Sequence, residues 1–325
     1  MKHNVNYVIA NPAGNITILV LSPVKRTEYQ RIARFLLEKN EDAEQVGYIL
    51  TPDQCLAEPE DAADYNAEQE KARAAAVSAA KAGLPRMEMC GLELCGNASR
   101  AFGYYAAMQH EPPLSDLGIS VSGSDAPLHV TILSPEDENT GMDMDSIGMP
   151  VPVSMEEIRI PLKDGKNFIE GRLVHMEGIS HLVITSFSSA VIRGTARDEM
   201  EALFCYLRDE VYRMSDRDLP AFGIMFYDPA DTLLTPIVYV RDVDTIYFEG
   251  SCASGSSAAA YALAAGAARD ESAQGRDQES LSMTYTFRQP AGTLSVEVRQ
   301  AGGKVEAVEL MGDISISEIK SLEIE

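Results

Sequence analysis

The same order of secondary-structure signals occurs twice along this chain, and each copy contains a cysteine ahead of an apolar helix pattern. The first is Cys95, which opens the run Cys-Gly-Asn-Ala-Ser-Arg at 95–100. The second is Cys252, which opens the run Cys-Ala-Ser-Gly-Ser-Ser at 252–257. A repeat of this length indicates two similar domains rather than a stack of short units. A pseudo-twofold axis between such domains would bring both cysteines to one cleft.

In each half, a β-rich segment, an amphipathic helix and a second β-rich segment precede the cysteine, and a compact helix with a strand pair follows it. Apolar residues at i, i+3, i+4 and i+7 predict the amphipathic helices. Thr27 with Gln30, and Asp198 with Glu201, match the capping box that opens a helix. The expected elements of the first half lie at 15–20, 27–40, 45–50, 98–108, 119–122 and 128–132, and those of the second at 181–185, 198–211, 223–227, from 252 onwards, 283–287 and 294–298.

The boundary between the halves is expected near residue 150, where prolines are frequent. The predicted domains are 1–150 and 151–325, and a strand from 311–325 is a candidate to complete the first. The predicted linker is 149–153, extending to about Asn167.

Two acidic stretches, at 53–70 and 135–145, are expected to be solvated surface insertions, because a charge run is usually a solvated face. The alanine-rich segment 67–82 is predicted to be an exposed helix.

Composition excludes several classes of function. The formal net charge of −23 argues against nucleic acid or an anionic membrane surface as a partner. The N-terminus has no apolar signal core, and no apolar run reaches the roughly 20 residues that a membrane span needs. Five cysteines are too sparse for a disulfide framework, so we expect a cytoplasmic protein. The expectation of a small-molecule partner rests on the chemistry of the two cysteine loops. A homodimer is a candidate assembly.

The two cysteines have the chemistry needed to invert a stereocentre. The unpaired N–H groups and the positive dipole at a helix start favour a thiolate there. One thiolate and one thiol on opposite faces could remove and return a Cα proton. Backbone N–H groups at the two helix starts would stabilise the charge that forms on the substrate carboxylate, without a cofactor. The residues that supply these groups are Gly96, Asn97, Ser254, Gly255 and Ser256.

A plainer interpretation is that each cysteine is a small buried hydrophobic residue. Their equivalent places in the repeat count against it. Cys55, Cys90 and Cys205 are expected to be structural. The interval from Cys90 to Cys95 matches no zinc motif, so no metal is expected. The second loop lacks the lysine of a P-loop. A redox sensor, in which facing thiols oxidise, stays open as an alternative.

Both loops resemble the catalytic loops of the diaminopimelate epimerase-like superfamily of cofactor-independent racemases and epimerases. Within it, short blocks along nearly the whole chain resemble the histidine racemase branch, which supplies D-histidine for opine-type metallophores. The blocks are 11–20, 44–47, 93–98, 121–123, 249–252 and 289–292.

This resemblance implies an α+β fold of two pseudo-symmetric domains. Each would be a β-sheet wrapped around a central helix, with the active site in the interdomain cleft. It implies catalytic roles for Cys95 and Cys252, with His181 and Glu249 beside the thiols. It also implies that Asn15 and Gln45 line the pocket.

The resemblance also bears on the substrate. Diaminopimelate epimerases place a Glu-Arg pair ahead of the second cysteine, whereas Glu249 is followed by Gly250. Without that arginine, a bidentate grip on a distal carboxylate loses its obvious candidate, so histidine is favoured. Diaminopimelate, another amino acid, and a binding protein without turnover are the alternatives.

Overall fold

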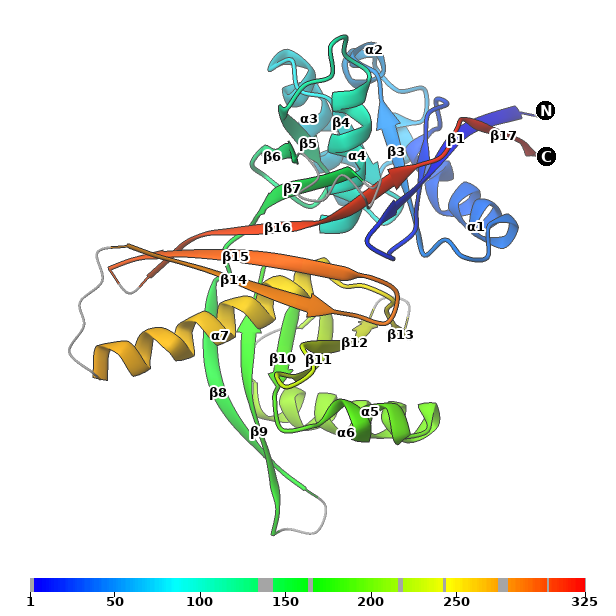
Figure 1. Ribbon diagram of the computed structural model, residues 1–325. Coiled ribbons are helices and arrows are strands. Elements are labelled where there is room, and N and C mark those ends of the chain that lie inside the picture. Colours follow the sequence, from blue (N-terminus) through cyan, green and yellow to red (C-terminus); the bar gives the residue numbers. More distant parts are fainter. Residues whose placement is uncertain are drawn as a thin grey trace. The chain divides into compact units, whose positions relative to one another are not determined.

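The computed structural model describes residues 3–133, 143–162, 166–215, 219–241, 244–273, 280–302 and 304–324. It is a mixed α+β structure that is rich in strands (Figure 1). The chain forms two compact units. Unit 1 comprises Met1–Gly148 and Met311–Glu325, and unit 2 comprises Met149–Leu310. No helix within the described ranges is both long and apolar enough to cross a membrane.

Unit 1 combines one core helix with strands from both ends of the chain. Its strands are β1 (His3–Pro12), β2 (Thr17–Val20), β3 (Gln45–Leu50), β4 (Arg86–Met89), β5 (Asp116–Val121), β6 (Leu128–Leu133), β7 (Asp143–Met149), the end of β16 (Lys304–Ile316) and β17 (Lys320–Ile324). Its helices are α1 (Tyr29–Lys39), α2 (Pro52–Leu56), α3 (Ala67–Lys81) and α4 (Gly96–Met108), with short 3-10 turns η1 (Arg26–Glu28) and η2 (Ala62–Asp64).

The core helix of unit 1 is α4, which contacts β1, β2, β3, β5 and β6. Small residues permit this close packing, since a Cβ added at Gly103 would lie 2.4 Å from Cγ2 of Val130. Polar residues of its first two turns, Asn97, Ser99 and Arg100, are also buried. The helix that follows Cys95 is therefore enclosed by the sheet of its own unit.

Unit 2 has the same kind of organisation around α7. Its strands are β8 (Ser154–Pro161), β9 (Phe168–His175), β10 (Ser180–Ile184), β11 (Ala221–Asp228), β12 (Leu233–Val240), β13 (Thr245–Phe248), β14 (Ser280–Arg288), β15 (Thr293–Ala301) and the start of β16. Its helices are α5 (Ser189–Gly194), α6 (Arg197–Met214) and α7 (Ala253–Ala273). Strands β9, β10, β11, β14 and β15 all contact α7.

The strand pairings of the two units follow one order. In unit 1, β2 is parallel to β3, β3 is antiparallel to β4, and β4 is parallel to β5. In unit 2, β10 is parallel to β11, β11 is antiparallel to β12, and β12 is parallel to β14. In both units the cysteine helix lies, along the chain, ahead of the last strand of this series, β5 or β14. That strand is also the first strand of a hairpin, β5–β6 or β14–β15.

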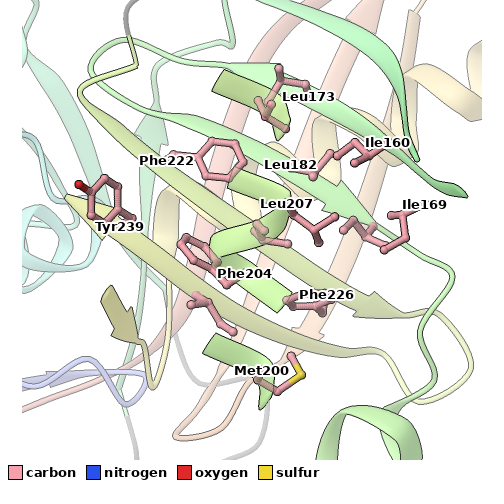
Figure 2. Close-up of a cluster of buried hydrophobic side chains, with 14 of the residues drawn as sticks. Ile160, Ile169, Leu173, Leu182, Met200, Phe204, Leu207, Phe222, Phe226 and Tyr239 are labelled. Carbon is pink, nitrogen blue, oxygen red and sulfur yellow. The ribbon is translucent and has the colours of Figure 1, made fainter. Parts of the chain in front are cut away.

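The second amphipathic helix packs as its sequence pattern indicates. Met200, Phe204 and Leu207 lie on one face of α6 and are buried against Phe222 and its neighbours in the sheet of unit 2 (Figure 2). Burying side chains of this size stabilises the fold by about 1.5–3 kcal/mol each.

Both predicted capping boxes are wrong. Thr27 lies in η1, and its hydroxyl donates to Asp61 Oδ2 at 2.8 Å instead of capping α1. Helix α6 already begins at Arg197, so Asp198 is inside its first turn. The structure has capping boxes at Thr51–Gln54 and Asn66–Gln69. Sequence spacing identified the helices but not the residues that start them.

The extension of the linker to Asn167 is also wrong, because β8 pairs with β9 along its whole length. The predicted exposed helix at 67–82 is α3, which buries three alanines, at 72, 76 and 79. Within the first acidic stretch, Asp61 is buried and binds Thr27, so that stretch is not wholly solvated.

Part of the second acidic stretch lies outside the described residues. Its last residues belong to β7, where Asp145 is completely buried. The expectation of a solvated loop is therefore wrong there, because Asp145 has a buried cationic partner, Arg100.

Candidate active site

Cys95 is the N-cap residue of α4 and has an extended backbone. Its Sγ accepts the N–H of Ala98 at 3.4 Å. Its carbonyl oxygen accepts both the N–H of Ser99 at 2.9 Å and the Ser99 hydroxyl at 2.7 Å. The thiol therefore replaces the serine or aspartate oxygen that usually caps a helix, and it lies at the positive end of the dipole.

The hairpin turn after β5 holds the chain just ahead of Cys95. The Ser122 hydroxyl accepts the N–H of Met89 at 2.8 Å and donates to the Glu93 carbonyl at 3.0 Å. Gly123 has φ +71°, and a Cβ there would lie 2.1 Å from the backbone nitrogen of Leu94. Only glycine permits this approach.

Two predicted pocket residues of unit 1 lie together. Gln45 Nε2 donates to the Asn15 side-chain oxygen and, at 3.0 Å, to the Thr17 hydroxyl. Asn15 Nδ2 donates to Glu44 Oε2 at 2.6 Å. Asn15 is almost completely buried, so these bonds fix the direction of its amide. The sequence did not predict a role for Thr17 or for Glu44, although Glu44 is the first residue of the block 44–47 that resembles the histidine racemase branch.

A buried ion pair anchors the second turn of α4. Arg100 donates to Asp145 Oδ1 through Nε at 2.8 Å and through Nη2 at 2.6 Å. Its Nη2 also donates to the carbonyls of Gly312 at 2.6 Å and Asp313 at 3.0 Å in β16. Burial raises the pKa of Asp145, and Arg100 opposes that shift. The pair ties the helix that carries Cys95 to β7 and β16.

Cys252 has the same hydrogen-bond pattern at the start of α7. Its Sγ accepts the N–H of Gly255 at 3.3 Å. Its carbonyl accepts the N–H of Ser256 at 3.0 Å and the Ser256 hydroxyl at 2.7 Å. A Cβ at Gly255 would lie 2.2 Å from the sulfur of Met225, so a larger residue there would require the Met225 side chain to move.

The side chains around Cys252 form a connected polar group. Glu249 is hydrogen-bonded to the Cys252 thiol. Ser254 Oγ lies 3.6 Å from Cys252 Sγ and 3.0 Å from His181 Nε2. The structure thus brings together the predicted residues Cys252, His181, Glu249 and Ser254, with Gly255 and Ser256 in the same loop.

His181 is neutral at physiological pH, because complete burial lowers its pKa to about 3. Its Nδ1 is buried and has no hydrogen-bond partner among the described residues. It faces Gly223, where an added Cβ would lie 2.3 Å away. A neutral imidazole with a free Nδ1 is best protonated on Nε2, which then donates to Ser254.

The helix start lowers the pKa of the Cys252 thiol, as expected, but not enough to make it a thiolate. Burial raises the pKa of this thiol well above its ordinary value, and the negative charge of Glu249 raises it further. Ser254 and the N–H of Gly255 lower it but do not compensate. Cys252 is therefore a thiol at neutral pH, whereas the half-buried Cys95 has more contact with solvent.

The fold is shared with solved enzymes that change stereochemistry at carbon. A hydroxyproline epimerase from Agrobacterium vitis superposes with a TM-score of 0.54 at 12% identity, covering 98% of this chain and 91% of that one. A probable proline racemase from Agrobacterium radiobacter K84 gives 0.57 at 11% identity, covering 99% and 93%. The chain therefore has the same fold as these solved racemase and epimerase structures.

Similarity in sequence identifies the family. Residues 76–319 match the family described as histidine racemase CntK N-terminal domain. The histidine racemase of Fusobacterium nucleatum subsp. nucleatum ATCC 23726 is 30% identical over 79% of this chain and 81% of its own length. That of Staphylococcus aureus Mu50 is 21% identical over 76% and 75%. The chain belongs to the histidine racemase family, which confirms the family predicted from the sequence.

Proposed function

We propose that this protein racemises histidine without a cofactor, with Cys95 and Cys252 as the acid/base pair. The observation that carries the proposal is the matching placement of the two thiols. Each precedes the core helix of its unit, and each Sγ accepts a backbone N–H three residues further on. Relatives named histidine racemase support histidine as the substrate.

The proposal includes the architecture that the family resemblance implies. The chain would have two pseudo-symmetric domains, 1–150 completed by 311–325, and 151–325, with the active site in the cleft between them. The shared order of strand pairings supports the internal symmetry.

In the proposed reaction, a thiolate takes the Cα proton from one face and a thiol gives a proton to the other. For one direction, the Cα–H electron pair stays on carbon while the proton forms the S–H of Cys95. The S–H of Cys252 then breaks, and its proton forms the new Cα–H bond. The protein finishes with Cys95 as thiol and Cys252 as thiolate, which is the starting state for the reverse direction.

The raised pKa of Cys252 suits it to the role of proton donor in the resting state. After transfer, its thiolate would be stabilised by the N–H of Gly255 and by the Ser254 hydroxyl. Ser254 is free to donate because His181 donates to its oxygen. His181 and Glu249 thus act on Cys252 without contacting the reacting carbon.

Negative charge on the substrate carboxylate would be stabilised by the helix-start N–H groups, chiefly those of Gly96 and Asn97 in unit 1 and Ser254 in unit 2. The N–H groups of Gly255 and Ser256, also expected for this role, instead donate to Cys252 Sγ and to the Cys252 carbonyl. Asn15 and Gln45 would line the pocket in unit 1, where their mutual hydrogen bond fixes their orientation before substrate enters. Preorganised dipoles of this kind cost little reorganisation during the reaction.

The proposal is tested by Cα deuterium incorporation in D2O, under reductant, with separate L-histidine, L-proline and LL-diaminopimelate. Label together with D-isomer from histidine alone is the expected result. The same signal from another substrate would keep the mechanism and replace the substrate. Binding of histidine without exchange would instead identify a binding protein.

Three expectations accompany the proposal. The first is a cytoplasmic location, which the small number of cysteines supports. The second is that the D-histidine produced is supplied to opine-type metallophores, as the histidine racemase branch implies. The third is a homodimer, which light scattering in solution would test.

A further inference from the structure

The turn between β14 and β15 reaches back to the loop that carries Cys252. Gln289, at the start of this turn, is almost completely buried. Its Oε1 accepts the backbone N–H of Cys252 at 2.8 Å. Its Nε2 donates to the Ser256 hydroxyl at 3.0 Å. The oxygen and the nitrogen of one carboxamide therefore both form hydrogen bonds with the turn that carries Cys252.

These bonds enclose both backbone polar groups of Cys252. The Ser256 hydroxyl accepts a hydrogen bond from the Gln289 amide and donates one to the Cys252 carbonyl at 2.7 Å. The turn is fixed as well, because Gln289 N–H donates to the Gly292 carbonyl at 2.8 Å, and Ala291 N–H donates to the Gly250 carbonyl at 2.9 Å. The chain is thus held on both sides of the cysteine.

The backbone of a cysteine sets the direction of its Cα–Cβ bond, and therefore the few positions that Sγ can reach through its rotamers. An acid/base thiol needs that direction set closely, because small misplacements of a reacting group cost large factors in rate. The hydrogen bonds of Gln289 fix the backbone of Cys252 and the first turn of α7, which supplies the N–H that contacts Sγ.

We infer that Gln289 is a positioning residue for Cys252, holding its Sγ and the N–H groups of the α7 start in register. This inference rests on the proposed role of Cys252. The first cysteine loop supports it independently, because there too the turn after the cysteine helix holds the loop, through Ser122 and Gly123. Unit 1 holds the backbone one and two residues before its cysteine, whereas unit 2 holds the cysteine itself.

The test compares Gln289→Leu with Gln300→Leu. Gln300 is also buried and on the same hairpin, but its register partner Leu281 places it at the opposite end from the turn. We expect Gln289→Leu to lower kcat for histidine racemisation by about 30- to 100-fold, with KM changed less than about threefold. Gln300→Leu should leave kcat within about twofold.

A second readout does not depend on turnover. The pH profile of iodoacetamide alkylation, resolved by mass spectrometry for Cys252 and Cys95, reports each thiolate separately. In Gln289→Leu, the midpoint for Cys252 should rise because the α7 start no longer holds its N–H on Sγ, while that for Cys95 stays unchanged. An unchanged Cys252 profile together with kcat within twofold of wild type would overturn the inference, as would an equal loss in Gln300→Leu.

Gln289→Glu keeps the test decisive if the leucine variant does not fold. The carboxylate has the same shape and still accepts the Cys252 N–H, but it cannot donate to Ser256. Its kcat should fall at least about threefold below that of wild type, and wild-type kcat with an unchanged alkylation profile would contradict the inference. Cys252→Ser separates the two ideas: full racemisation by that variant would refute the proposed function, while the alkylation profiles would still test the positioning role.

Discussion

The two cysteine loops have the same hydrogen-bond pattern and differ in the side chains that surround the thiol. In both, Sγ accepts an N–H three residues on, and the carbonyl accepts a serine hydroxyl four residues on, from Ser99 or Ser256. Around Cys252 lie a carboxylate and a buried imidazole, Glu249 and His181. Cys95 is half-buried and heads a helix anchored by an ion pair.

A repeated turn therefore leaves the acidity of its thiol to the surrounding residues. The common turn gives each sulfur the same dipole and the same kind of N–H contact. Burial and the neighbouring carboxylate then raise the pKa of Cys252. A racemase needs one thiol and one thiolate at the start of each turnover, so surroundings that keep Cys252 protonated are useful to the proposed reaction.

The largest expected effect is on activity. Cys95→Ser and Cys252→Ser should each lower the rate of histidine racemisation by about 10³-fold, because a serine hydroxyl is a far weaker acid and its alkoxide is inaccessible at neutral pH. Chiral chromatography of the product measures this. Cys205→Ser on α6 is the matched control and should keep wild-type activity. Near-normal activity in either loop variant would remove the two-thiol mechanism.

The next effect concerns stability and distinguishes unit 1. Arg100→Met should cost about 3–5 kcal/mol in urea denaturation, because it leaves Asp145 charged, buried and without its cation. The pair of Arg213 with Glu210 in unit 2 is the control, and Arg213→Met should change the stability far less because Arg213 is exposed to solvent. Adding Asp145→Leu to Arg100→Met should restore much of the loss. Similar costs for both single arginine variants would show that the burial of the Arg100 pair has no energetic consequence.

A pH effect distinguishes unit 2. The pKa of His181 is about 3 in the folded protein and about 6.5 when unfolded, so its neutral form stabilises the fold above pH 6.5. This contribution is lost as the pH falls from 6.5 towards 3. Between pH 7 and pH 5 the loss is about 2 kcal/mol. His181→Gln should therefore lose about that much less stability than wild type over this interval, and equal losses in urea titrations would contradict the burial argument.

The smallest effect tests how the surroundings of Cys252 set its acidity. Glu249→Gln removes the negative charge beside Cys252, so the pKa of that thiol should fall. Alkylation of Cys252 at fixed pH should become faster, while alkylation of Cys95 stays as it is. If both thiols respond alike, Glu249 does not act locally on Cys252.

The features that follow from regular patterns of apolar and small residues were predictable from the sequence. The repeat, the core helices after Cys95 and Cys252, and the amphipathic helix α6 follow from hydrophobic period and from small residues at helix starts. The polar group around Cys252 was also anticipated, but through resemblance, since nothing in the spacing relates His181 to a residue 71 positions later.

Interactions that depend on tertiary partners were not predictable. The pattern at Thr27 fits a capping box, yet its hydroxyl binds Asp61 because the α2–α3 segment folds over it. Asp145 lies in an acidic stretch, and its burial depends on Arg100 at the core of α4. The weak acidity of Cys252 likewise arises from enclosure, which a helix-start rule does not include.

Strand β16 crosses the boundary between the units, and β1 pairs with both β16 and β17. On the ribosome, the first strand therefore emerges together with its neighbour β2 but long before β16 and β17, and all of unit 2 is synthesised in between. Unit 1 reaches its full strand complement only after translation of the final strands, so during synthesis the nascent β1 has an open edge that invites wrong pairing. A tag or a proteolytic cut near residue 320 would consequently act on the N-terminal unit.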